Sequence, residues 1–161
     1  MKLSTSQQIE ELIDAIQDFG KENLEEILHK LLEGVQILAD GGHCRIYLED
    51  LTMGAITCAA ATGGDTLHQQ MNFSPINNSQ FLISQVYQQK QELAIRDLSQ
   101  YPQDLLLVTG NHKVGASYLL PITQLGRSIG VLCLDREKST QFPPERNLHH
   151  IRKLLSLIHI S

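Results

Sequence analysis

Residues 116–134, ASYLLPITQLGRSIGVLCL, decide the fold class of this 161-residue chain. Two strongly apolar segments, 116–122 and 128–134, flank a short connection with Gly126, a residue that readily adopts the positive φ angles of tight turns. Both segments carry apolar residues on both faces, so the sheet that contains them is expected to be covered on both sides. The stretch therefore predicts a β-hairpin within a buried sheet.

Further extended segments lie upstream of this hairpin. Residues 43–50 place Ile46 on one side and Tyr47 on the other, and a short turn leads to a second apolar run over 54–61. A brief strand is expected over 93–96, followed by an irregular crossing over 97–113 that contains a proline. These segments supply the other strands of the same sheet.

Amphipathic segments with apolar residues at helical spacing surround the strands. They predict helices over residues 6–19, from about 23 to 39, over 79–89, and after Phe142-Pro143-Pro144 near the C-terminus. Strands split by a long central excursion and flanked by helices indicate an α+β domain around a mostly antiparallel sheet. The last helix reaches Ser161 without a stop signal, which suggests a piece of a longer protein.

Charge and cysteine content limit the function classes. The chain has 13 Lys and Arg against 18 Asp and Glu residues, a formal net charge of −5, so we expect neither nucleic-acid binding nor adhesion to anionic membranes. It contains no apolar run of about 18 residues, so no membrane insertion is expected. Its N-terminal residues also lack the pattern of a secretory signal. Its three cysteines are widely spaced and odd in number, which favours a reducing compartment, and we expect a cytoplasmic location.

The order and spacing of several segments resemble the GAF domain, a sensor family of bacterial signalling proteins. The resemblance covers about residues 22–160, with residues 1–21 as an N-terminal extension helix and 22–161 as the GAF domain. The segments that carry it are Leu24–Ala39, Cys44–Leu48, Leu93–Asp97 followed by Pro102, Ser117–Ile122, Ile129–Leu134, and Phe142-x-x-Glu145.

This resemblance implies a central antiparallel sheet of five or six strands. The N- and C-terminal helices would cover one face, and loops and short helices on the other face would enclose a small-molecule cavity. It also implies a homodimer formed through the terminal helices. Within such a cavity, we expect Tyr47, Phe81, Asp97, Tyr118 and Leu120 to contact a ligand, because pockets combine aromatic walls with a few polar anchors. Asp97 could equally cap the loop that follows it.

Departures from the family's specialised members narrow the ligand classes. Members that bind cyclic GMP carry an Asn-Lys pair, a Phe and an Asp-Glu pair, whereas this chain has Asp135-Arg136, Phe142 and Arg146-Asn147. Bilin-binding members need a cysteine in or near the cavity loops, but all three cysteines here fall within expected strands. Residues 63–115 contain no cysteine, unlike the family's methionine sulfoxide reductases. The sequence therefore names no cofactor.

Other candidate chemistry is weak. His149 and His150 point about 100° apart on a helix, so they do not share one metal ion easily, and alternation places His43 and Cys44 on opposite faces of a strand. There is no nucleophile elbow of the Gly-x-Ser-x-Gly type and no phosphate-binding loop. We expect no metal site and no catalytic residue.

Three functions follow in order of preference. The first is a small-molecule-sensing regulatory domain of a larger bacterial protein, namely a histidine kinase, a cyclic-nucleotide enzyme or a transcription activator. The second is a ligand-free dimerisation or interaction module, which the low aromatic content of 5% favours slightly because aromatic pocket walls are scarce. The remote third is a redox enzyme of the methionine sulfoxide reductase type.

Overall fold

A computed structural model describes residues 4–19, 24–39, 42–62, 73–76, 81–100, 115–136 and 141–158. Six antiparallel strands form one sheet in the order β3-β2-β1-β6-β5-β4. The strands are β1 (His43–Asp50), β2 (Ala55–Ala61), β3 (Phe73–Pro75), β4 (Leu93–Ile95), β5 (Ala116–Gln124) and β6 (Arg127–Arg136). The helices are α1 (Thr5–Phe19), α2 (Leu24–Leu38), α4 (Leu82–Gln89) and α5 (Glu145–Leu155), with a 3₁₀ turn at Leu98–Gln100.

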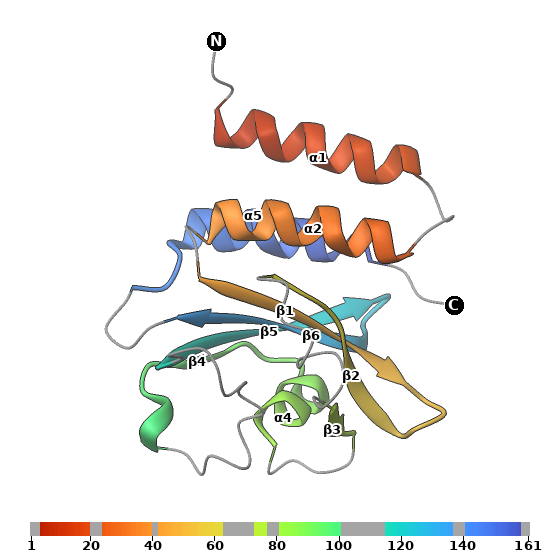
Figure 1. Ribbon diagram of the computed structural model, residues 1–161, viewed down its shortest axis with the longest axis vertical. Helices are drawn as coiled ribbons and strands as arrows, with labels where there is room; N and C mark the ends of the chain where they lie inside the picture. The colour runs from red at the N-terminus through yellow and green to blue at the C-terminus, as the bar shows by residue number, and fades with distance from the viewer. Residues whose placement is uncertain are drawn as a thin grey trace.

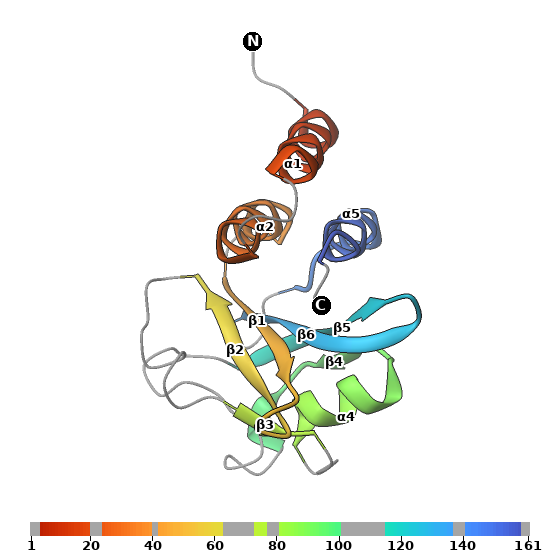
Figure 2. The ribbon, with the colours of Figure 1, turned by 90° about the vertical axis from the view of Figure 1, so that its right-hand side faces the viewer.

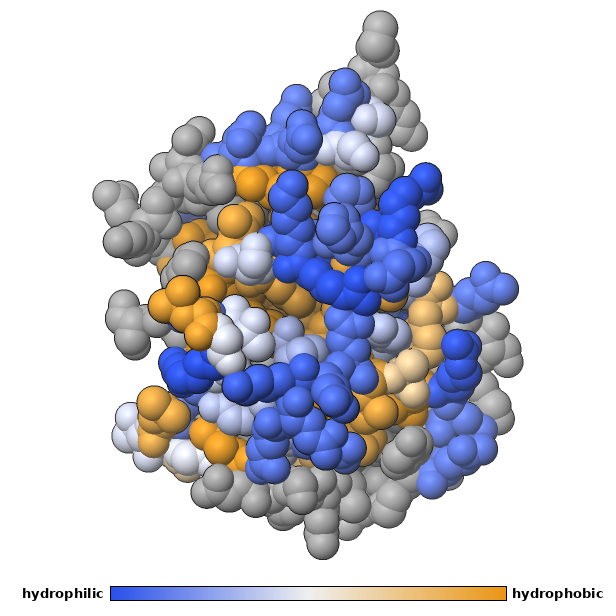
Figure 3. Space-filling view, turned by 180° about the vertical axis from the view of Figure 1, so that it is seen from behind, coloured by the Kyte–Doolittle hydropathy of each residue, from blue (hydrophilic) through white to orange (hydrophobic). Residues whose placement is uncertain are grey.

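The helices are divided between the two faces of the sheet. Helices α2 and α5 lie side by side over one face, α1 lies outside them, and α4 lies against the opposite face (Figures 1 and 2). Seen from behind, hydrophilic side chains cover much of the helical layer, and apolar side chains show in the seam below α1 (Figure 3). This arrangement confirms the predicted α+β architecture.

Two apolar clusters pack against the two faces. The helix-side cluster joins α1, α2 and α5 to the sheet through residues such as Ile46 and Leu132, and the α4-side cluster contains Tyr47, Val131 and Ile83. The side-chain alternation predicted for β1 is therefore correct. Because strands β1, β5 and β6 contribute to both clusters, they connect the two layers physically.

The hairpin that decided the fold class has the expected turn. Leu125 and Gly126 both have positive φ angles, 52° and 78°, which match the two central positions of a type I′ turn. Strand β5 pairs with β6 from Ala116 opposite Arg136 to Gln124 opposite Arg127. The prediction of this hairpin is confirmed, with strands slightly longer than expected.

Helix α1 packs closely on the layer below it. The side chains of Ile9 and Ile13 are buried, and a Cβ atom added to Gly34 of α2 would lie 2.2 Å from Leu12 Cδ2. Glycine at this position allows the two helices to approach. Among the described residues, no helix is long and apolar enough to cross a membrane.

Some predicted bounds need correction. Strand β3 was missed, because residues 64–78 look like a polar excursion. The helix expected over 79–89 begins at Leu82, after Phe81 in extended conformation, and residues 79 and 80 lie outside the described part. Most of the predicted crossing, residues 101–113, also lies outside it.

Candidate functional site

A buried charged cluster lies on the α4 side of the sheet. Arg45 Nε donates to Asp135 Oδ2 at 2.7 Å, and Arg45 Nη2 donates to Asp135 Oδ1 at 3.0 Å. Arg45 Nη1 donates to the Tyr47 hydroxyl oxygen at 2.7 Å, and Ser117 Oγ donates to Asp135 Oδ1 at 2.9 Å. The side chains of Arg45 and Asp135 are only 3% and 2% exposed, so the bidentate pair is shielded from solvent.

Strand register brings this cluster together. Arg45 on β1 lies opposite Cys133 on β6, so Asp135, two residues further on, is its diagonal neighbour on the same face. Ser117 on β5 lies directly opposite Asp135. Strand β1 and the β5–β6 hairpin, which lie far apart in the sequence, thus supply the members of one network.

Burial and pairing oppose each other in this cluster. Burial alone would lower the pKa of Arg45, but the Asp135 carboxylate beside it raises that pKa well above its ordinary value, so the guanidinium stays charged. Burial raises the pKa of Tyr47, and the Arg45 charge lowers it only in part. The phenol therefore stays neutral and accepts the hydrogen bond from Arg45.

The three cysteines are buried and unpaired. Burial raises the pKa of Cys58 to about 11 and that of Cys44 to about 12, and it raises the pKa of Cys133 further. Since the thiolate is the nucleophile and the metal ligand, thiols in this state are poorly reactive. The described residues include no group of three or more His, Cys, Asp or Glu that could hold a metal ion.

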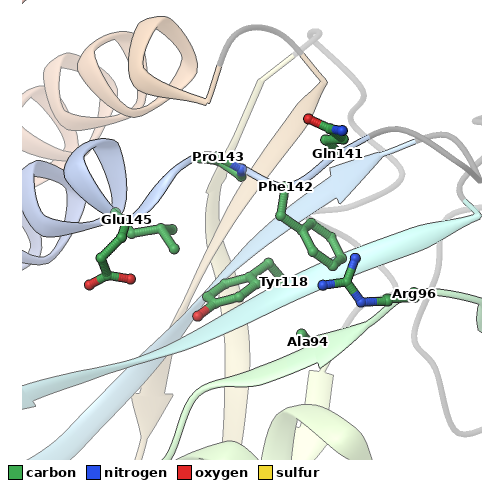
Figure 4. A pocket seen from close by; sticks show the side chains of 8 residues that line it. Ala94, Arg96, Tyr118, Gln141, Phe142, Pro143 and Glu145 are labelled. Atoms are coloured by element: carbon green, nitrogen blue, oxygen red, sulfur yellow. The ribbon is translucent and has the colours of Figure 1, made fainter.

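A groove of about 440 Å³ opens on the helix side, where β4 and β5 meet the start of α5 (Figure 4). The rings of Tyr118 and Phe142 meet edge to face at 5.4 Å between their centroids. The guanidinium carbon of Arg96 lies 5.4 Å from the centroid of the Phe142 ring. The lining residues are Ala94, Arg96, Tyr118, Gln141, Phe142, Pro143, Glu145 and Leu148.

One end of this groove carries an ion-pair network. Arg152 on α5 donates to both carboxylate oxygens of Glu92 and also to Glu145, and the Tyr118 hydroxyl donates to Glu92 at 2.7 Å. Hydrogen bonds from Arg152 lower the pKa of Glu92 below its ordinary value. Burial, together with the bond to Glu92, raises the pKa of Tyr118 to about 12. Both carboxylates at this end are therefore ionised and already paired.

Comparison with known proteins identifies the family. The model of the GAF domain family matches residues 23–158, which is most of the chain. The chain belongs to the GAF family. None of the curated proteins compared with it matches.

Solved GAF structures share this fold. The GAF domain of a phosphoenolpyruvate-protein phosphotransferase from Acinetobacter is 16% identical, with a TM-score of 0.79 over 98% of this chain and 91% of that one. The corresponding domain from Coxiella burnetii is 17% identical, with a TM-score of 0.74 over 95% and 89%. Free methionine-R-sulfoxide reductase from Neisseria meningitidis is 17% identical, with a TM-score of 0.65 over 98% and 89%. Identities this low establish a common fold alone.

The five predicted ligand contacts do not form one site in this GAF domain. Tyr47 is fully buried on the α4 side, and Phe81 is half-buried at the start of α4. Tyr118 and Leu120 lie on the other face, with the helix-side cluster. Asp97 Oδ1 accepts hydrogen bonds from the Ser99 backbone N–H and hydroxyl at 3.0 and 2.6 Å, a geometry that favours the loop-capping interpretation.

Sequence reasoning missed the charged members of both regions. Arg45 and Asp135 are 90 positions apart, and each sits in a strand among apolar residues. A charged residue within an apolar strand is the signal that could have found them, because such residues are rarely buried unless paired. Arg96 and Phe142 were noted as family motif positions without a ligand role.

Proposed function

We propose that this GAF domain is a small-molecule-sensing regulatory module of a larger bacterial signal-transduction protein, without catalytic activity of its own. The observation that supports it best is the buried cluster of Arg45, Asp135, Ser117 and Tyr47 on the α4 face. Related folds occur in a methyl-accepting chemotaxis protein and in a GAF domain/HD domain protein, which fits a regulatory role. The output domain would be a histidine kinase, a cyclic-nucleotide enzyme or a transcription activator.

The need to fill the core does not explain the buried cluster of Arg45, Asp135, Ser117 and Tyr47. Burying an ion pair is costly, and well-packed apolar residues of similar volume often hold a core equally well or better. A polar network on one face of the sheet can anchor polar groups of a ligand, and strands β1, β5 and β6 join that face to α2 and α5. A ligand that binds one arrangement of these strands more tightly would shift the helices toward it.

Two features support a role without catalysis. The thiols of Cys44, Cys58 and Cys133 have raised pKa values caused by burial, which is opposite to what a nucleophilic cysteine needs. The likeness to a methionine sulfoxide reductase extends to the fold, and fold does not fix function. We also propose a cytoplasmic location, which the three free cysteines support.

A paired substitution tests the sensing role. In a thermal-shift screen of metabolites, we expect at least one compound to raise the melting temperature of the 161-residue chain. The double variant Arg45→Met with Asp135→Leu should fold, because both charges are removed together, and should lose that shift. The sensing proposal is wrong if no compound shifts the melting temperature, or if the double variant responds as strongly as the wild type.

The alternative is a ligand-free homodimer formed through the terminal helices. An observation that favours it is Ile37, which is 57% exposed on α2. Against it, α1 already buries Ile9 and Ile13 within its own chain. Sedimentation of the whole chain and of a variant lacking residues 1–21 distinguishes the two, since a monomer at high concentration in both cases would rule out the dimer.

A further inference from the structure

Two arginines flank an alanine in one row across the helix side of the sheet. Arg136 pairs with Ala116, and Arg96 follows Ile95, whose partner is Ser117, so Arg96 lies beside Ala116 on the other side. Arg96 lines the groove together with Ala94 and Tyr118, which places it on the helix side. Alternation from Leu132 and Leu134, both in the helix-side cluster, places Arg136 on that side too.

Neither arginine has a counter-charge among the residues that the structure describes. Arg136 is 8% exposed, and its Nε and Nη2 atoms are buried without a hydrogen-bond partner. Arg96 is exposed and makes a contact with the Phe142 ring, but it forms no hydrogen bond or ion pair within the described ranges. Buried polar groups in proteins are nearly always paired, so the unpaired guanidinium of Arg136 requires an explanation.

Within the part of the chain that the structure describes, the carboxylates near the two arginines are engaged elsewhere. Asp135, next to Arg136 in β6, points to the opposite face and pairs with Arg45. Glu92 and Glu145, at the other end of the groove, are both held by Arg152. Asp97, next to Arg96, accepts two hydrogen bonds from Ser99. The positive charge at the Arg96 end of the groove is therefore not neutralised by these groups.

We propose that the groove binds a small organic anion whose phosphate or carboxylate group contacts Arg96, with Arg136, outside the groove lining on the far side of Ala116, as a second, buried positive charge. Tyr118 and Phe142 offer ring faces and edges to a flat apolar body attached to that group. Figure 4 shows Arg96 and Glu145 at opposite ends of the groove with the two rings between them, so the negative group of the ligand belongs at the Arg96 end.

This site is separate from the cluster on which the sensing proposal rests. It lies on the helix side of the sheet, whereas Arg45 and Asp135 lie on the α4 side. Phe142, Glu145 and Leu148 span the entry into α5, so an occupant would contact the C-terminal helix directly. The groove proposal therefore stands or fails independently of the α4-side cluster.

Titration calorimetry of the whole chain tests the site with three probes: phenyl phosphate, benzoate and inorganic phosphate. We expect phenyl phosphate or benzoate to bind at millimolar concentration and more tightly than inorganic phosphate, because the rings contribute contact area. The stronger of the two organic probes indicates whether phosphate or carboxylate is the preferred group. Benzyl alcohol, which lacks the charge, should not bind.

Variants localise the binding. Arg96→Gln should lower the affinity for the tighter-binding organic probe by on the order of tenfold, as expected for the loss of a charge-assisted contact. Ala94→Phe should block the groove without changing its charge, and Arg136→Met should weaken binding by a smaller factor. Arg146→Gln is the matched control, since Arg146 is exposed in the first turn of α5 and does not line the groove; it should change affinity less than about twofold.

The outcomes separate clearly. Binding that Arg96→Gln and Ala94→Phe abolish or weaken, and that Arg146→Gln spares, supports the proposal. Absence of binding by all three anions overturns it, and so does an equal loss in Arg96→Gln and Arg146→Gln, which would indicate general attraction to positive charge. Circular dichroism spectra that match the wild type ensure that a loss of affinity does not reflect unfolding.

Discussion

Two arginines are buried on opposite faces of the same sheet, and their surroundings differ. On the α4 face, Arg45 has a bidentate carboxylate partner in Asp135 and a hydroxyl partner in Tyr47. On the helix face, two buried nitrogen atoms of Arg136 have no hydrogen-bond partner in the described part of the chain. The difference indicates that the charge of Arg45 is compensated within the folded protein, whereas the charge of Arg136 opposes folding unless an anion compensates it.

The largest expected effect is at Arg45. Arg45→Met should destabilise the fold by about 3–5 kcal/mol, because it leaves the Asp135 carboxylate buried without its counter-charge. Urea unfolding followed by circular dichroism measures this change. Adding Asp135→Leu should recover most of the loss.

A double-mutant cycle decides whether the pair acts as a unit. If Arg45→Met costs less than about 1 kcal/mol, Asp135 is not an uncompensated buried charge in that variant, and the contrast between the two faces disappears. If the double variant is as unstable as the single one, packing of the Arg45 side chain rather than its charge holds this region together.

Arg136→Met should stabilise the fold, in contrast to Arg45→Met. The substitution removes a buried group with unsatisfied donors and keeps most of its volume, so we expect a gain of about 1–3 kcal/mol in the free energy of unfolding without ligand. The same urea titration checks it, and saturation with the groove ligand should reduce the gain. A loss of stability would show that the protein itself compensates the charge of Arg136. The proposed difference between Arg136 and Arg45 would then be wrong.

The sequence was sufficient for most of the fold. Hydrophobic runs interrupted by Gly126 gave the β5–β6 hairpin, and the bounds of β1, His43–Asp50, were predicted as observed. Strand β3, Phe73–Pro75, could not be found, because a three-residue edge strand has too few positions for alternation to show. Its pairing with β2 depends on tertiary contacts that no local pattern encodes.

The candidate sites were much less predictable. Alternation assigned Tyr47 to the face opposite Ile46, because neighbouring side chains of a strand point to opposite faces. It did not separate Tyr118 and Leu120 from Tyr47, because β5 is apolar on both faces and therefore gives no sign of which side is which. The contact between Arg45 and Asp135 depends on the pairing register of β1 with β6, which the pattern of either strand alone does not reveal.

The thiols provide an intermediate effect on both faces. Cys58 lies on the face of Arg45, and Cys44 on the face of Arg136; burial raises their pKa values from 9.0 to about 11 and about 12, and each arginine only partly offsets this. The unfolded chain loses these protons near pH 9, whereas the folded chain keeps them. The stability of the fold should therefore be complete below about pH 9 and should fall as the pH rises towards 11, by up to about 1.4 kcal/mol per pH unit for each thiol.

Urea unfolding at successive pH values measures this slope. Cys58→Ala should reduce it, by no more than one proton's contribution, and leave the neutral-pH spectrum unchanged. Native protein should also resist thiol alkylation at neutral pH. Rapid alkylation of Cys58 in the folded state would show an accessible thiolate, and would revive the enzymatic alternative on the α4 face.

The smallest effect is expected at the edge of the groove, where Glu92 bonds to Arg152 and Tyr118. Arg152 lowers the pKa of Glu92, so the stabilisation from this pair is present above the ordinary pKa of 4.5 and is lost as the pH falls through the lower folded value. Because both side chains remain partly exposed, with 36% and 26% accessible, solvent screens the pair. Glu92→Gln should therefore cost less than about 1 kcal/mol at neutral pH and should flatten the acid limb of the stability curve slightly. If Glu92→Gln costs as much stability as Arg45→Met, burial does not explain why the charged pair on the α4 face stabilises the fold more than the pair at the groove.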